Sequence, residues 1–264
     1  MGVNPHAVTV SPSRRLLFTA VTLVVAIVLL FAVLGRLTRT TRPAAPAVDQ
    51  GRPGPVLLVP GYGGGTGALE VLAERLRAAG REAIVVPLPG DGTGDLRLAA
   101  KALAVAADAA IAAGAVSVDV VGYSAGGVTA RLWAAGGGAR QARRIVTLGS
   151  PHHGTKVAAL AATLAPGACP EACRQLVPGS SLLDGLAEAP DGPAWLSLWT
   201  TGDETVTPPT SARLDGATDL ALQDLCPAAQ VSHSDLPRAP AVEGVVLAAL
   251  AGPRLVVPAR CPSS

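Results

Sequence analysis

The chain has 264 residues, of which 49% are hydrophobic and 15% charged, and its formal net charge is +2. This length suits one domain with a sizeable core, and so small a charge gives no electrostatic reason to expect nucleic acid as a partner. Aromatic residues make up only 3% of the chain, which also argues against a surface for base stacking.

The first predicted element is an apolar run at residues 16–34, LLFTAVTLVVAIVLLFAVL, which follows Arg14 and Arg15. As a helix it would be roughly 28 Å long, close to the thickness of a bilayer core. The run predicts a transmembrane signal-anchor with residues 1–15 in the cytoplasm, or alternatively a signal segment that is removed. We favour the anchor, because the run is longer than a usual cleaved segment and no clear A-x-A site follows it.

Residues 35–54 are rich in Arg and Pro and are predicted to form an extended linker to a domain at residues 55–264. The domain contains all four cysteines. Their spacing favours the disulfides Cys169–Cys173 and Cys226–Cys261, although four cysteines allow three connectivities. A zinc site is the alternative, but only one pair is close and no His lies near. Disulfides place the domain outside the cytoplasm, on a membrane anchor or secreted if residues 16–34 are cleaved.

From residue 55 onward, apolar runs typical of strands alternate with amphipathic helices. Strands are predicted in PVLLVPG, EAIVVPLPG, VSVDVVGYS, ARRIVTLGSP, AWLSLWTTGDETV and ATDLALQDL, and helices in ALEVLAERLRAAG, DLRLAAKALAVAADAAIAAG, AGGVTARLWAA and AVEGVVLAALAG. Residues 156–190 are predicted to be an irregular insertion. The alternation predicts an α/β fold with a mostly parallel central sheet and helices on both faces.

One serine, Ser124, stands at the end of the third predicted strand. The pentapeptide GYSAG at residues 122–126 matches G-x-S-x-G and lies between a strand and a helix, the context that this motif requires. The carboxyl end of a strand in such a sheet is also where ligands bind. We therefore predict that Ser124 is a nucleophile. Glycines that merely allow close packing are the alternative, and the motif of a phosphate-binding loop is missing.

A serine nucleophile needs a base, and the chain has four histidines. His6 precedes the apolar run. His152 and His153 follow a strand too closely to leave room for an acid strand between them and Ser124. His233, which comes after the last predicted strand, is therefore the predicted base. For His152 and His153 we expect a structural role beside the site, with substrate contact as the alternative.

The acid of a triad should lie between the serine and the base in the sequence. Asp203 comes just after the strand in AWLSLW and is the predicted acid, with Glu204 as the alternative. Its role would be to orient the imidazole and stabilise its charged form. Two backbone N–H groups, of Tyr62 in PGYGGGTG and of Ala125, are predicted to form an oxyanion hole.

These motifs resemble the α/β-hydrolases, and most of all the small secreted bacterial lipases and esterases of the lipase class 2 group. The resemblance is carried by LLVPGYGGG, VVGYSAGG, VTLGSPHHGT, TTGDETVTPP and VSHSDL, over roughly residues 55–252. Tyr123 and Pro60 stand where many members have His. The resemblance implies hydrolysis of carboxylic esters, often of fatty acids, without an organic cofactor. Some relatives bind structural calcium, but no metal ligands can be picked out here.

The sequence thus predicts a serine hydrolase that cleaves carboxylic esters of lipid or acyl type through a Ser124-His233-Asp203 triad and an acyl-enzyme. The expected partners are a small acyl ester and, through residues 16–34, a membrane, and the expected state is a monomer. A thioesterase, or an acyltransferase acting on a cell-envelope acceptor, is the alternative, followed by a non-catalytic binding protein on the same fold. Residues 156–190 are interpreted as a wall or partial lid of the acyl pocket, or else as a plain surface loop.

Overall fold

The computed structural model describes Leu23, residues 48–49 and residues 51–262. The chain divides into two units, residues 1–44 and residues 45–264, and the fold described below is that of the second unit. Within the described residues, no helix combines the length and the apolar character needed to cross a membrane. The predicted transmembrane run at residues 16–34 lies, apart from Leu23, outside the described residues and stays a prediction, as does the linker.

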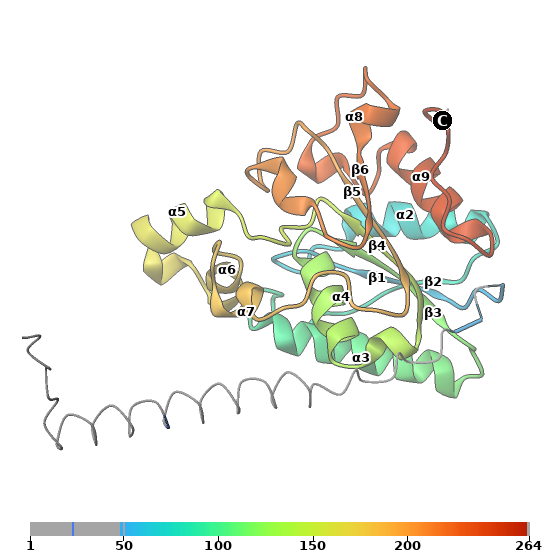
Figure 1. The fold of residues 1–264 in the computed structure, drawn as a ribbon, viewed down its shortest axis with the longest axis horizontal. Coiled ribbons are helices and arrows are strands. Elements are labelled where there is room, and N and C mark those ends of the chain that lie inside the picture. The colour runs from blue at the N-terminus through green and yellow to red at the C-terminus, as the bar shows by residue number, and fades with distance from the viewer. Residues whose placement is uncertain (1–22, 24–47, 50, 263–264) are drawn as a thin grey trace, which may run out of the picture. The chain divides into compact units, whose positions relative to one another are not determined.

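A parallel sheet forms the centre of the second unit (Figure 1). Its strands are β1 (Val56–Val59), β2 (Ala83–Val85), β3 (Val118–Tyr123), β4 (Ala142–Leu148), β5 (Ala194–Trp199) and β6 (Thr218–Ala221). They are arranged in the order β2-β1-β3-β4-β5-β6, and each neighbouring pair is parallel. The predicted parallel α/β fold is confirmed, and all strand ends that carry predicted site residues lie at one edge of this sheet.

Helices cover both faces of the sheet, because successive strand side chains point to opposite sides. On one face, α2 (Gly67–Ala78) and α9 (Pro240–Ala251) pack with strand residues such as Leu58 and Val121. On the other face, α3 (Leu96–Ala112) and α4 (Ala125–Ala135) pack with Leu57, Val120 and their neighbours. The buried residues of α2, which include Leu69, Leu72 and Leu76, show the spacing that predicted this helix.

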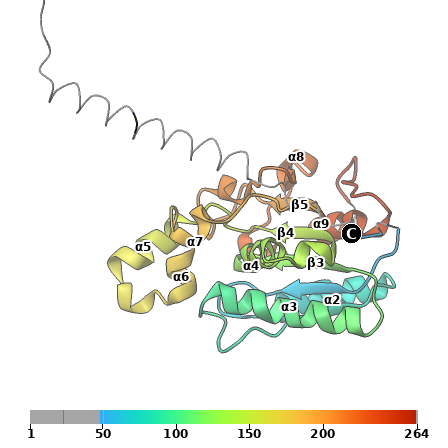
Figure 2. The same ribbon diagram turned by 60° about the horizontal axis from the view of Figure 1, so that its bottom comes forward.

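The segment after β4 is not the irregular insertion that was predicted. It forms the helices α5 (Lys156–Leu164), α6 (Glu171–Gln175) and α7 (Ser181–Asp184), which gather at one side of the sheet (Figures 1 and 2). The prediction overlooked the high helix propensity of KVAALAATL and its cap, the hydroxyl of Thr155, which accepts from the N–H of Val157. The predicted strand in ATDLALQDL is also shorter than expected, because α8 (Leu222–Leu225) directly follows β6.

Short 3-10 turns complete the described chain, at Gly138–Arg140, Pro166–Ala168, Pro209–Ala212 and His233–Asp235. Both predicted disulfides are present. Cys169 and Cys173 join across the turn that leads into α6, with their Cα atoms 5.2 Å apart. Cys226 and Cys261 join the loop after α8 to the carboxyl-terminal segment.

A buried ion-pair network lies at the amino end of β3 and β4. The carboxylate of Asp119, which has no exposed surface, accepts from Arg81 at 2.7 Å and from Nε of Arg143 at 2.9 Å. Both arginines also donate to the carbonyl of Leu250 near the end of α9, at 2.9 and 2.6 Å. Two permanent positive charges thus hold one carboxylate and the negative end of a helix dipole in the same place.

Candidate active site

Ser124 occupies the sharp turn between β3 and α4. Its backbone angles are φ 53° and ψ −126°, and it is the only non-glycine residue with positive φ in the described part of the chain. The turn leaves no room for a side chain at Gly122, where a Cβ atom would lie 2.6 Å from the carbonyl oxygen of Gly126. A strained serine at the end of a buried strand is held by its surroundings, with its hydroxyl at the edge of the sheet.

His233 lies on the 3-10 turn between α8 and α9, and its ring is buried beside Ser124. Its Nε2 atom is 3.0 Å from the Ser124 hydroxyl oxygen, and its Nδ1 atom is 2.6 Å from Oδ2 of Asp203. Because an ionised carboxylate can only accept, Nδ1 carries the proton. In the neutral ring, Nε2 is then free to accept the proton of the serine hydroxyl.

Asp203 lies just beyond the end of β5, and both oxygens of its carboxylate are engaged. Oδ2 faces His233, while Oδ1 accepts from the backbone N–H groups of Thr205 at 2.9 Å and Val206 at 2.7 Å. Asp203 is buried, whereas the neighbouring Glu204, the alternative acid, is exposed. The structure therefore brings together Ser124, His233 and Asp203, three residues far apart in the sequence.

Two backbone N–H groups adjoin the serine, those of Tyr62 after β1 and of Ala125 at the start of α4. The loop of Tyr62 packs on Ser124, since a Cβ atom on Gly61 would lie 3.0 Å from that of the serine. Neither N–H donates to a backbone carbonyl within the residues that the structure describes. Ala125 also stands at the positive end of the α4 dipole. Neither N–H is thus committed to a backbone partner within the described residues, and the oxyanion hole stays a prediction.

His152 and His153 lie beside this site without lining its pocket. His152 is buried, and its Nε2 atom is 3.1 Å from the hydroxyl of Thr147. Burial lowers the pKa of His152 well below its usual value, and the nearby charges of Arg131 and His153 lower it further. His153 is half-exposed and faces Glu188. These contacts favour the structural role that was expected for both histidines.

An apolar pocket of about 200 Å³ opens beside the Ser124 hydroxyl. Its lining residues come from the loop of Tyr62, from α5 and α6, and from the loop after Asp203: Tyr62, Ser124, Pro151, Thr155, Val157, Ala158, Ala161, Ala168, Cys173, Leu176, Thr205 and Val206. The segment at residues 156–190 thus supplies one wall of the pocket. Of the two readings of this segment, the wall is the one that the structure supports.

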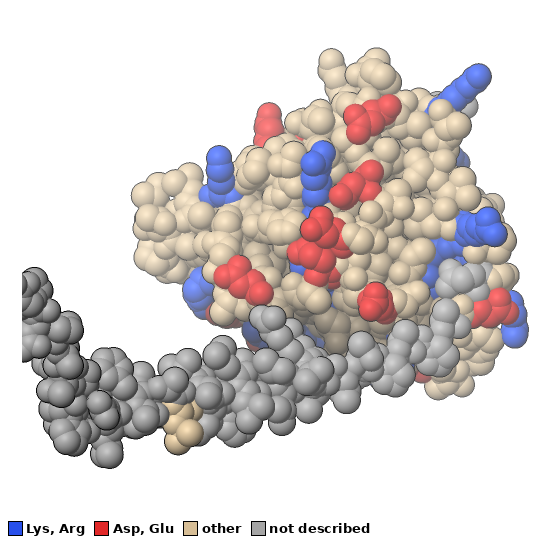
Figure 3. All heavy atoms as spheres, in the orientation of Figure 1, with Lys and Arg blue, Asp and Glu red and all other residues tan. Residues whose placement is uncertain are grey.

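Helix α5 also exposes two large apolar side chains. Leu160 is 60% exposed and Leu164 is 73% exposed, although the same helix supplies lining residues of the pocket. In Figure 3, the end of the visible face that α5 forms consists mainly of uncharged atoms, whereas acidic and basic side chains are interspersed elsewhere. Helix α5 is therefore apolar both where it lines the pocket and at these two exposed leucines.

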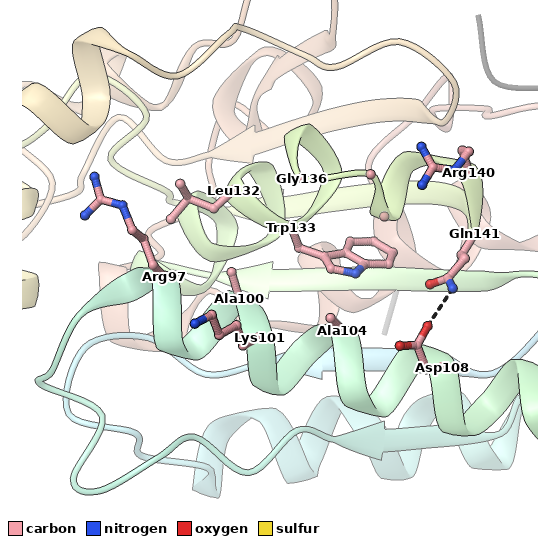
Figure 4. A pocket seen from close by; sticks show the side chains of 12 residues that line it. Arg97, Ala100, Lys101, Ala104, Asp108, Leu132, Trp133, Gly136, Arg140 and Gln141 are labelled. Atoms are coloured by element: carbon pink, nitrogen blue, oxygen red, sulfur yellow. Dashed lines mark hydrogen bonds between the residues drawn. The ribbon is translucent and has the colours of Figure 1, made fainter.

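A separate hollow of about 460 Å³ lies between α3 and α4 (Figure 4). Arg97, Lys101 and Trp133 are among its lining residues, and a hydrogen bond of 2.7 Å joins Gln141 to Asp108 there. Ser124 is not among the residues that line it. This hollow is therefore distinct from the pocket beside the serine.

Some residues that shape the site escaped the sequence analysis. Gly149, directly after β4, has φ 54°, and a Cβ atom there would lie 2.5 Å from Leu236 and about 3 Å from both Asp203 and His233. The available signal was the glycine that ends the apolar strand in VTLGSP. The amide bonds to Asp203 also had a signal, since an Asp often accepts from the backbone two or three residues ahead. For Tyr123, the sequence offered no signal beyond its place directly before the serine.

Neither a known family model nor a curated protein sequence matches this chain. Among solved structures, lipase B from Aspergillus fumigatus superposes with a TM-score of 0.62 at 18% identity, over 76% of this chain and 52% of that one. The mature form of lipase BlEst2 from Bacillus licheniformis gives a TM-score of 0.55 at 24% identity, over 67% and 86% of the two chains. Its propeptide form gives 0.62 at 21% identity, over 84% and 54%.

These likenesses define the class of the fold: the chain has the α/β-hydrolase fold, as the resemblance implied. The chain spans about half the length of the Aspergillus lipase. At such low identity, a shared fold does not by itself transfer an activity, so the function has to be argued from the site.

Proposed function

We propose that this protein is a serine hydrolase that cleaves carboxylic esters, with Ser124 as nucleophile, His233 as general base and Asp203 as the acid that orients it. The observation that carries the proposal is the continuous hydrogen-bond chain from Asp203 through His233 to Ser124. This chain ends beside an apolar pocket, on a fold shared with structures described as lipases. Each member of the chain has the chemical character that acyl transfer needs.

The reaction would begin when the Ser124 oxygen attacks the carbonyl carbon of the ester while its proton passes to Nε2 of His233. The Asp203 carboxylate, fixed by two backbone amides, stabilises the imidazolium that forms. The N–H groups of Tyr62 and Ala125 bind the oxyanion of the tetrahedral intermediate.

The intermediate then collapses as His233 gives its proton to the leaving alcohol, which leaves an acyl group on Ser124. Water, deprotonated by the same imidazole, then attacks the acyl carbonyl, and the acid is released as the imidazolium returns the proton to the Ser124 oxygen. This cycle returns Ser124 and His233 to their starting protonation states. It uses only side chains and backbone groups that already surround the serine.

We assign the acyl chain of the ester to the apolar pocket beside Ser124. Its walls are almost entirely apolar, which suits a hydrocarbon acyl chain better than a sugar or a charged group. A volume of about 200 Å³ is small for a ligand pocket. We therefore propose that short acyl chains are preferred over long ones, with the alcohol part of the ester directed toward solvent.

The two disulfides support a place outside the cytoplasm for the domain. With the apolar run at residues 16–34, they suggest a hydrolase on the outer side of a membrane, or a secreted one if this run is removed. The predicted monomer remains a prediction.

The direct test is hydrolysis of p-nitrophenyl butyrate by the wild type and by Ser124→Ala. We expect the variant to lose at least about a thousandfold in kcat while its thermal unfolding is unchanged. Ser117→Ala, which alters a serine at the opposite end of β3, is the matched control and should keep the wild-type rate. A folded Ser124→Ala variant with the wild-type rate would refute the proposal.

A further inference from the structure

Tyr123 is the residue of this site whose presence the reaction does not require. It is the last residue of β3 and directly precedes Ser124. Its hydroxyl donates to the backbone carbonyl of His233 at 3.2 Å, across 110 positions of sequence. Its ring also lies against the His233 ring, with centroids 5.2 Å apart and planes inclined by 34°. One side chain therefore contacts both the main chain and the side chain of the proposed base.

The backbone that carries His233 has little regular structure of its own. The residue lies on a three-residue 3-10 turn between two helices. Two side chains from strand ends reach this loop: Thr200 donates to the carbonyl of Val231 at 2.9 Å, and Tyr123 donates to that of His233 itself. Of these two hydrogen bonds, the one from Tyr123 acts directly on the residue whose ring must face the serine.

From these contacts we infer that Tyr123 is a positioning residue, whose hydroxyl holds the base at the correct distance from the nucleophile. Since Tyr123 and Ser124 are adjacent, the strand end that carries the nucleophile also anchors the backbone of the base. The two reacting groups are then linked directly through one residue, in addition to the longer path through loops and helices. This inference rests on the proposed function, because it assigns a role within the same triad.

The surroundings keep the Tyr123 hydroxyl protonated. Burial raises its pKa to about 12, and the nearby carboxylates of Asp203 and Asp235 contribute in the same direction. A hydroxyl that stays protonated can donate to the His233 carbonyl at any pH used in an ester assay. The hydrogen bond therefore acts as a fixed tether and not as a second titrating group.

The test compares Tyr123→Phe, which removes only the hydroxyl, with the wild type and with Ser117→Ala. Ser117 makes a bond of the same kind at the other end of the strand, from its hydroxyl to the carbonyl of Arg52 at 3.1 Å. We expect Tyr123→Phe to lower kcat for p-nitrophenyl butyrate by about tenfold, because small displacements of reacting groups slow a reaction strongly. KM should stay unchanged, and Ser117→Ala should keep the wild-type kcat even if it is less stable.

Tyr123→His is the second variant, and it introduces the residue that the resembling lipases often have at this place. An imidazole is too short to reach the His233 carbonyl with the backbone as it stands, so we expect a similar loss of kcat. An independent readout is the proton of the Nδ1–H group of His233, whose short bond to Asp203 should give a strongly deshielded NMR signal. In Tyr123→Phe this signal should shift upfield or broaden, whereas Ser117→Ala should leave it unchanged.

Each kcat is divided by the concentration of active sites, measured by titration with a fluorophosphonate, so that unfolded protein is not counted as enzyme. The inference is overturned if Tyr123→Phe keeps the wild-type kcat, if only KM changes, or if Ser117→Ala loses as much kcat. It is overturned as well if both Tyr123 variants fail to fold, because the residue would then act on stability. A wild type that the fluorophosphonate does not label at Ser124 would instead refute the proposed function.

Discussion

The two ends of the sheet each bury an aspartate, and the two carboxylates are held in opposite ways. At the amino end, Asp119 forms ion pairs with Arg81 and Arg143, and arginine keeps its charge at any ordinary pH. At the carboxyl end, Asp203 faces His233, whose ring can gain and lose a proton. The same residue type thus forms a permanent ion pair at one end and a pair of variable charge at the other.

The surroundings of the two aspartates differ as well. The arginines around Asp119 also donate to the carbonyl of Leu250 at the end of α9, so that other protein groups share in binding both guanidinium groups. Beside His233, by contrast, stand a strained serine and an open apolar pocket. In the proposed reaction, the buried charge of Asp203 differs from that of Asp119 because its partner can exchange a proton and stands beside a nucleophile.

Asp203→Asn should have the largest effect, and it should act on rate. The N–H groups of Thr205 and Val206 would keep the amide oxygen on their side, so that the amide NH2 faces His233 and donates to Nδ1. The imidazole would then hold its proton on Nε2, which is the wrong tautomer. We expect kcat for p-nitrophenyl butyrate to fall by about 10³- to 10⁴-fold, with little change in the free energy of unfolding in urea. Glu204→Gln, next along the chain and exposed, is the control. A modest loss, matched by Glu204→Gln, would remove Asp203 from the mechanism.

Asp119→Asn should have the opposite signature. Removing the charge leaves the buried Arg143 and the part-buried Arg81 without the carboxylate that neutralises them, and breaking a buried ion pair typically destabilises a protein by about 3–5 kcal/mol. Chemical denaturation should show this loss in the free energy of unfolding. The kcat of the molecules that remain folded should equal that of the wild type. An Asp119→Asn variant with the wild-type free energy of unfolding but a reduced kcat would contradict this difference between the two ends of the sheet.

Ala161→Phe tests the pocket that distinguishes the carboxyl end. Ala161 lines the pocket from α5, so a phenyl group there should fill part of it. We expect kcat/KM for p-nitrophenyl hexanoate to fall by about tenfold, the effect of roughly 1.4 kcal/mol, while the acetate ester is hydrolysed as before. Leu160→Phe is the control, because Leu160 is an exposed residue of the same helix that does not line the pocket. An equal effect on both esters would mean that the acyl chain binds elsewhere.

The pH dependence of stability should reveal His152, whose pKa burial lowers well below the usual value of 6.5. Because the folded pKa is the lower one, the stabilising contribution of the neutral ring is complete above pH 6.5 and is lost as the pH falls below it. The loss is at most about 1.4 kcal/mol per pH unit. Between pH 7 and pH 5, the free energy of unfolding in urea should fall less steeply with decreasing pH in His152→Gln than in the wild type. Equal pH slopes in the wild type and in His152→Gln would contradict this role of His152.

The sequence predicted the features that depend on local pattern and on order along the chain. Apolar runs located the strands, and the turn at Ser124 followed from its glycines. His233 was singled out because few histidines compete for its role. The structure brings Ser124, His233 and Asp203 together as this reasoning expected, although their catalytic roles remain proposals.

Features that depend on tertiary contacts were beyond the sequence. The tether from Tyr123 and the space for the Asp203–His233 pair at Gly149 join residues from distant parts of the chain, and no local spacing reports such a contact. The helices of residues 156–190 were missed for a different reason. Their Pro, Gly and Cys residues suggested an irregular loop, whereas short helices between those residues are compatible with the same composition.

Covalent labelling of the wild-type domain by a fluorophosphonate is the most direct test of the central claim, that His233 activates Ser124 as a nucleophile. The proposal predicts one phosphonate adduct per chain, located on Ser124 by peptide mass spectrometry. In His233→Ala the labelling rate should fall by about a thousandfold or more, while Ser117→Ala labels at the wild-type rate. An adduct on another residue, or unchanged labelling of Ser124 in a folded His233→Ala variant, would contradict it.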